Sequence, residues 1–268
     1  MATRDRNGAL HSEKNGQFVS GGDSGSSGFD VEALEKQPRG HDATIRPGEG
    51  EPPDEARSLA LEYKLPGIKL TVNPGKYSKE SKAYENRIRA ELRIPNVEIS
   101  KIDKVCAYDV YSSLKSCIAS FPSMKGFIKG VRYDPDVNEL AQWHPFAKEI
   151  ILGRAYSDAG IVEKTYNDCV ADKFFASGIT HRAVVAHEFG HAINTRFSSR
   201  SYDFAESVKT EIYHHFGIDD EYVRKNICEY ATLNSAEFVA VLFHRCAEQT
   251  NTSDDIMEKF KSILRRYK

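Results

Sequence analysis

Apolar residues recur at helical spacing from residue 78 to the end of the chain. Side chains three or four residues apart fall on one face of a helix, so this spacing predicts helices. The most apolar stretch, 180–197, contains no proline, and Thr180 can serve as its N-cap. The pattern predicts helices over 78–92, 105–121, 161–174, 180–197, 201–216, 219–228, 235–248 and 253–267.

Alternating apolar and polar residues, which are typical of strands, precede the most apolar helix. Residues 127–133 and 148–153 are strand candidates, joined by a loop that holds Trp143 and His144, and 68–72 is a shorter candidate. A small sheet beside that helix could offer its edge strand to an extended peptide, whereas a plain structural hairpin is the alternative. The sequence therefore predicts an α+β fold, mostly helical, with a small β-sheet beside one central helix.

The first part of the chain has a different composition. Residues 1–56 are rich in Gly, Ser, Asp, Glu and Pro, and they hold too few apolar side chains to offset the entropy of the chain. We therefore expect a disordered polar tail over 1–56 and one domain over 57–268. Within the tail, 13–22 resembles a short pattern in the tails of phage-encoded proteins associated with capsids.

Composition and charge limit the function classes. The chain has 268 residues, of which 40% are hydrophobic and 28% charged, and its net charge is −2. This balance argues against a nucleic-acid partner. No apolar run is long enough to cross a bilayer and no signal-peptide core is found, so we expect a cytoplasmic protein on synthesis with no membrane partner. The five cysteines form no C-x-x-C pair, which favours reduced, buried thiols. The oligomeric state is left open.

The most apolar helix carries an H-E-x-x-H motif. With about 3.6 residues per turn, His187 and His191 share one face and can offer two nitrogens to one zinc ion. Glu188 then lies beside the metal, where it could take a proton from water. Burying two histidines and a glutamate in such an apolar stretch requires partners, which a metal supplies. The alternative is a metal-free core helix with a chance motif.

A zinc site of this type needs a third protein ligand. The metzincin extension is excluded because Asn194 and Phe197 occupy its positions. Glu211 has the spacing of thermolysin-like enzymes, but His215 stands where those have an acid, and the two residues also fit a surface pair. Glu237 begins an apolar helix, where a buried carboxylate would be costly without a cation. Both glutamates remain candidates on spacing alone.

The motif and its surroundings resemble a known family. H-E-F-G-H-A at 187–192, followed by Y-A-x-x-N-x-x-E-F-x-A at 230–240, resembles the catalytic domain of anthrax lethal factor and its relatives, including predicted peptidases of phages and mobile elements. The resemblance implies a zincin-like metallopeptidase domain, a peptide or protein substrate and one Zn²⁺. The residues it implies are His187, His191 and Glu237 as metal ligands, Glu188 as general base and Tyr230 as electrophilic stabiliser.

Two positions depart from the family pattern. Val241 stands where an acidic residue is usual, and Asn194 where an aspartate is common. Loss of such outer hydrogen-bond partners typically costs about 10 to 100-fold in metal affinity or activity. We therefore keep two hypotheses: a zinc endopeptidase, and a phage- or mobile-element-associated structural or binding protein that retains the zinc site with little or no turnover. After synthesis, association with a virion or export by a non-classical route is left open. His244, on the same helical face as Glu237, is interpreted as a core histidine.

Overall fold

A computed structural model of the chain describes residues 2–4, 10–12, 18–19, 75–176, 181–248 and 254–267. The chain divides into two units, Met1–Glu49 and Gly50–Lys268. In the first unit an antiparallel sheet has the order β1-β2-β3, formed by Ala2–Arg4, Leu10–Ser12 and Phe18–Val19. The rest of the tail expected over 1–56, and the strand expected over 68–72, lie outside the described residues. The disordered tail therefore stays a prediction.

The second unit is mostly helical and includes one small sheet, as the α+β prediction expected. Its helices are α3 (Lys79–Leu92), α4 (Lys104–Ser120), α5 (Ala159–Ala171), α6 (Val184–Phe197), α7 (Phe204–Phe216), α8 (Asp220–Asn226), α9 (Ser235–Glu248) and α10 (Asp255–Leu264). Each corresponds to one helix predicted from periodicity. Among the described residues, no helix is long and apolar enough to cross a membrane.

Side-chain caps explain where most of these helices begin. An Asp or Ser side chain accepts a hydrogen bond from a backbone N–H of the first turn, which would otherwise lack a partner. The capping residues are Ser78, Asp103, Asp158, Asp203, Asp219 and Asp254. Helix α6 differs, because it begins at Val184 directly after a 3₁₀ turn, η3 (His181–Ala183), and has no side-chain cap. Thr180, the predicted cap, lies outside the described residues.

The four-stranded sheet does not join the two predicted strands as a hairpin, the alternative that the sequence left open. Its order is β4-β5-β7-β6, from Asn96–Glu98, Gly130–Tyr133, Glu149–Leu152 and Ala141–His144. Strands β5 and β7, the two predicted strands, run parallel, and β6 pairs antiparallel with β7 at one edge. Trp143 and His144, expected in a loop, are therefore part of an edge strand. The sequence of β6, Ala-Gln-Trp-His, holds no β-branched residue, whereas the equally short β5 and β7 hold Val131, Ile150 and Ile151, and β-branched residues favour strands.

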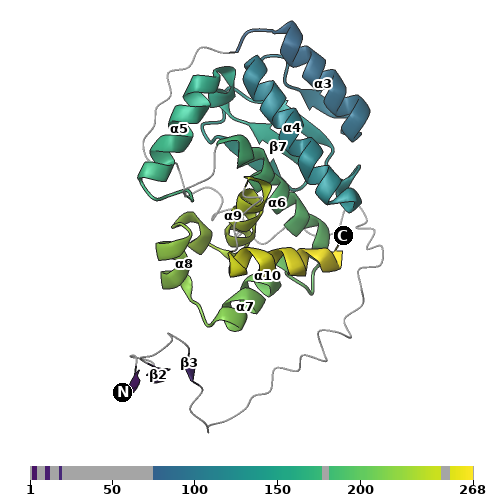
Figure 1. Ribbon diagram of the computed structural model, residues 1–268. Coiled ribbons are helices and arrows are strands. Elements are labelled where there is room, and N and C mark those ends of the chain that lie inside the picture. Colours follow the sequence, from purple (N-terminus) through teal and green to yellow (C-terminus); the bar gives the residue numbers. More distant parts are fainter. Residues whose placement is uncertain are drawn as a thin grey trace. The chain divides into compact units, whose positions relative to one another are not determined.

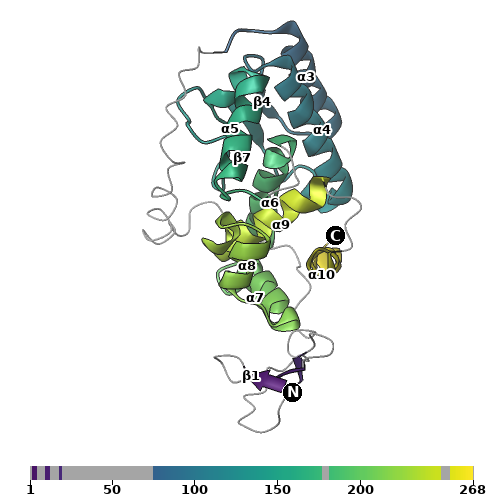
Figure 2. The ribbon, with the colours of Figure 1, turned by 60° about the vertical axis from the view of Figure 1, so that its left-hand side comes forward.

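Helices α6 and α9 lie at the centre of this unit. In both views the sheet, α3, α4 and α5 lie on one side of this pair, and α7, α8 and α10 lie on the other (Figures 1 and 2). Nine of the fourteen residues of α6 are buried, including His187 and Glu188. Apolar residues of α9 pack against it: Ala240 lies next to Gly190, and the Phe243 ring stacks on that of Phe189 with centroids 5.6 Å apart. Helix α6 is thus a central core element, with the sheet, α3, α4 and α5 on one side and α7, α8 and α10 on the other.

Candidate metal centre

Three side chains that could bind a metal ion converge between α6 and α9. His187 and His191 lie one turn apart on α6, and Glu237 lies in the first turn of α9. Glu237 Oε2 is 3.1 Å from His187 Nε2 and 3.3 Å from His191 Nε2. The two imidazole nitrogens are 3.2 Å apart. In the described part of the chain, no other group of His, Cys, Asp and Glu side chains has this arrangement.

The spacing of the three atoms fits a four-coordinate metal ion. Zinc bonds of about 2.0–2.1 Å in a tetrahedral arrangement place neighbouring ligand atoms about 3.3 Å apart. The measured separations of 3.1, 3.2 and 3.3 Å are close to that value. Two nitrogens and one carboxylate oxygen also match the donors of catalytic zinc sites, although other divalent transition metals accept them. The residues present therefore fit a metal ion bound by His187, His191 and Glu237.

The charges in this cluster favour a bound cation. Burial alone would raise the pKa of the Glu237 carboxyl, but the charge of His191 and hydrogen bonds from both histidines hold that pKa well below its usual range. Burial alone would lower the pKa of His191, but the Glu237 charge raises it to about 9. The cluster thus keeps an ionised carboxylate and attracts a proton. A metal ion would replace that proton, since metal ligands bind in deprotonated form.

A glycine allows the two helices to approach closely enough to form the cluster. Gly190, which precedes His191, packs against Ala240, which lies one turn after Glu237. A methyl group added at Gly190 would lie 2.9 Å from Ala240 Cα and 3.2 Å from Phe243 Cβ. The first of these atoms is backbone and cannot move aside without shifting α9. The glycine in the motif therefore sets the distance between the two helices that supply the ligands.

We expect Gly190→Ala to destabilise the fold and weaken metal binding. Alanine is intrinsically better than glycine in a helix by about 1 kcal/mol, but overpacking a tight contact costs typically about 1–3 kcal/mol. Denaturant unfolding and zinc titration would measure both effects. Gly160→Ala, within α5, is the matched control, because its new methyl would meet only the Asp158 side chain at 3.3 Å. Equal stability and zinc affinity of Gly190→Ala and wild type would contradict this role.

Glu188 lies beside the cluster without belonging to it. The residue is 5% exposed, and its carboxylate accepts a hydrogen bond from the backbone N–H of Trp143 in β6. Burial raises the pKa of Glu188, although the neighbouring charges of His187 and His191 partly oppose this. A buried carboxylate with a raised pKa takes up a proton more readily than an ordinary one.

Tyr230 also reaches the cluster, from the 3₁₀ turn η4 (Tyr230–Thr232). Its ring stacks on the His187 imidazole, with centroids 5.5 Å apart, and its hydroxyl donates a hydrogen bond to Glu237. Burial, and then the charges of Glu237 and Glu188, raise the pKa of Tyr230 well above its ordinary value. Its other contacts are with the rings of Phe174 and Phe175. Tyr230 therefore keeps its proton and remains a hydrogen-bond donor at the edge of the cluster.

The two departures from the family pattern have identifiable surroundings. The Asn194 amide oxygen accepts hydrogen bonds from Ser198 and from the backbone of Ala205, so it joins α6 to α7. Val241 is a core residue, 2% exposed. The buried Nδ1 of His187 has no hydrogen-bond partner among the described residues. This imidazole thus lacks the outer partner that usually orients a metal-binding histidine.

Glu211, the other candidate for third ligand, belongs to a different contact. Its carboxylate pairs with Lys259 at 2.9 Å and with Arg266 at 3.1 Å, which ties α7 to α10 and to the 3₁₀ turn that follows it, η5 (Arg265–Tyr267). His215 is exposed. Of the two glutamates left open by spacing, Glu237 is the one that meets the histidines.

A hollow opens beside the cluster, between β6 and the aromatic residues. It is lined by residues 139–141, by Phe174, Phe175 and Tyr230, and by Val184, His187, Glu188 and His244. His244 is 3% exposed, and its Nε2 lies 3.4 Å from the Tyr166 hydroxyl. The His244 side chain is thus buried and near a hydrogen-bond partner, which agrees with the interpretation of His244 as a core histidine. The same side chain also lines the hollow.

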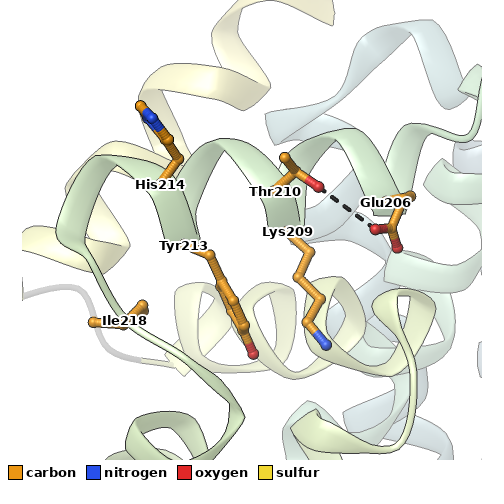
Figure 3. A pocket seen from close by; sticks show the side chains of 6 residues that line it. All are labelled: Glu206, Lys209, Thr210, Tyr213, His214 and Ile218. Carbon is orange, nitrogen blue, oxygen red and sulfur yellow. Dashed lines mark hydrogen bonds between the residues drawn. The ribbon is translucent and has the colours of Figure 1, made fainter. Parts of the chain in front are cut away.

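A second hollow lies on α7 and at the turn that follows it (Figure 3). Its lining residues are Glu206, Lys209, Thr210, Tyr213, His214 and Ile218. Tyr213 and Lys209 both bind the Asp220 carboxylate, whereas His214 points away from them. None of these residues belongs to the metal cluster, so the hollow next to His187 is the candidate substrate site.

Comparison of the chain with known protein families, curated proteins and solved structures found no match. The site must therefore be interpreted from its own chemistry. Sequence reasoning missed three of its contributors. Trp143 and Thr195, which hydrogen-bond to each other, are 52 residues apart, and no sequence pattern links them. The periodicity predicts Phe174 at the end of a helix, but the helix ends at Ala171 and Phe174 lines the hollow.

Proposed function

We propose that the protein is a zinc-dependent endopeptidase with a zincin-like domain. The observation that carries the proposal is the meeting of Glu237 with His187 and His191, while Glu188 remains outside the ligand set. This is the division between three metal ligands and a separate base that catalytic zinc sites use. The position of α6 between a sheet and a helical group supports the zincin-like assignment.

The reaction would divide among these side chains as follows. A zinc ion held by the three ligands would supply a Lewis acid for water and for the peptide carbonyl. Glu188 accepts the proton of the attacking water and later delivers it to the leaving amine. Its raised pKa suits a group that must hold that proton between the two steps. The Tyr230 hydroxyl, which donates to Glu237 in the structure, would turn its single proton to the carbonyl oxygen as negative charge develops there.

The edge strand β6 supports a peptide substrate. Leu140 C=O accepts a hydrogen bond from Gly153 N–H, so in this antiparallel pair the backbone groups of Ala141 and Trp143 point away from β7. The bond from Trp143 N–H to Glu188 agrees with that direction. Because Trp143 N–H is already bonded to Glu188, an extended peptide could pair with the other outward groups, the N–H and C=O of Ala141 and the C=O of Trp143, and lie across the metal cluster. Ala141 also lines the hollow, which would receive a substrate side chain.

Metal removal is the test of the proposal. We expect purified protein to carry about one zinc per chain and to hydrolyse members of a peptide library. Treatment with 1,10-phenanthroline should abolish hydrolysis and lower the melting temperature, because a ligand that binds only the folded state stabilises it. Added zinc should restore both, and the non-chelating 1,7-phenanthroline should change neither. Protein without stoichiometric metal would refute the metal site.

The alternative is a structural or binding protein that keeps the zinc site with little turnover. His187 Nδ1 has no hydrogen-bond partner in the part of the chain that the structure describes, and Asn194 is used at the α6–α7 junction. Both observations favour this alternative, because weak orientation of a ligand reduces activity. Zinc binding without hydrolysis of any library peptide would support this alternative.

A further inference from the structure

We propose that the hydrogen bond between Trp143 and Thr195 fixes the register of the edge strand β6 against the metal-binding helix, with both side chains acting as positioning residues for the peptide. The inference rests on the proposed peptidase function. The Trp143 indole Nε1–H donates to Thr195 Oγ1 at 2.9 Å. It is a side-chain bond between the strand that would hold the substrate and the helix that would hold the metal.

Trp143 contacts α6 at two points on one stripe. Its backbone N–H binds Glu188 and its indole binds Thr195, seven residues further along the same helix. Seven residues are close to two helical turns, so both contacts fall on the face that also carries His191. One tryptophan thus spans this face of the helix from the candidate base to a point one turn beyond the second metal ligand. A strand held by one contact could still shift along the helix. The two contacts, to Glu188 and to Thr195, together prevent that shift.

Thr195 is itself held in place. Its hydroxyl donates to the backbone C=O of His191 at 3.0 Å, so its lone pairs remain available to the indole. The bridge therefore runs from the strand to the backbone of a ligand. The Trp143 ring also stacks on Phe127, with centroids 6.3 Å apart, and Arg196 lies 5.4 Å from the centroid of Phe127. The Trp143–Phe127 pair is thus held by strand β6, through Trp143, and by helix α6, through Arg196.

The bridge has a consequence for catalysis rather than for folding alone. Strand β6 is short and pairs with β7 on one side only, so β7 alone gives it few backbone bonds. A peptide that pairs with the outward groups of Ala141 and the Trp143 C=O would be positioned relative to the metal only as accurately as β6 is positioned relative to α6. Displacement of a reacting group by about 1 Å can cost about 100-fold in rate.

The first experiment compares Thr195→Val with Thr195→Ser and wild type, all loaded with zinc. Valine keeps the shape and removes the hydroxyl, so we expect kcat to fall about 10-fold or more, with KM changing less. Serine restores the acceptor and should restore kcat. Thr210→Val is the matched control, because the single hydrogen bond of the Thr210 hydroxyl to a described side chain goes to the exposed Glu206, at 3.5 Å. Trp143→Phe should give a similar loss, and the double variant should lose no more than either single one.

A second readout does not depend on turnover. Trp143 is the only tryptophan in the chain, so intrinsic fluorescence reports this contact directly. We expect Thr195→Val to change the emission spectrum and to speed amide hydrogen exchange over 141–144, and Thr195→Ser to change neither. Unchanged kcat, emission and exchange in folded Thr195→Val would overturn the inference. A wild type that binds zinc but cleaves no peptide would instead refute the proposed function, and the exchange measurement would still decide whether the bridge holds the strand.

Discussion

Glu188→Gln is expected to reduce peptide hydrolysis by about 100 to 10,000-fold, because general acid–base catalysis contributes a factor of this size. The amide has nearly the same shape and can still accept the hydrogen bond from Trp143 N–H, but it cannot take up and return a proton. Peptide binding should change little. The measurement is kcat and KM on a peptide identified from the library, with enzyme of equal zinc content.

The comparison also separates chemistry from folding. Glu188 is buried and burial raises its pKa, so replacing its charge with a neutral amide removes an unfavourable burial. We therefore expect Glu188→Gln to be at least as stable as wild type and to bind zinc equally well. A variant that keeps zinc and retains activity within a few-fold would show that another group acts as the base.

The helices and the ligands of the candidate site could be anticipated because local sequence determines them. Periodic apolar residues fix the face that each helix buries, and the i, i+4 spacing alone places His187 and His191 together. Choosing Glu237 as the third ligand required further arguments, since spacing alone left Glu211 as an equal candidate. The cost of burying a carboxylate and the family resemblance both favoured Glu237, and that residue is the one beside the histidines.

The remaining features depend on contacts between distant segments. The sequence of β6 cannot reveal that it pairs antiparallel with β7, or that the order of the sheet makes β5 and β7 parallel neighbours. Gly190 in the motif gave no sign that it lies against Ala240. Long-range packing selects these arrangements, whereas local propensity selected the helices. Strand β6, which would position a substrate, was therefore less predictable from the sequence than α6 and α9, which carry the candidate metal ligands.

Glu237→Ala is expected to weaken zinc binding by at least about 100-fold, more than the loss of an outer hydrogen-bond partner typically costs. The change removes one of three protein ligands and leaves two imidazoles that lie 3.2 Å apart. It also removes the charge that raises the pKa of His191 to about 9, so that histidine should lose its proton at a lower pH. Competition with a chromogenic chelator would measure the affinity.

Glu211→Ala is the matched control, because it removes a second half-buried glutamate that the sequence also offered as a ligand. Zinc affinity should stay at the wild-type value, while the lost pairs with Lys259 and Arg266 should lower stability by about 1 kcal/mol. Burial opposes ionisation of Glu211, but the two cations outweigh it and lower its pKa. The stability difference should therefore be full at pH 7 and shrink as the pH falls below about 4. Loss of zinc from Glu211→Ala but not from Glu237→Ala would reverse the ligand assignment.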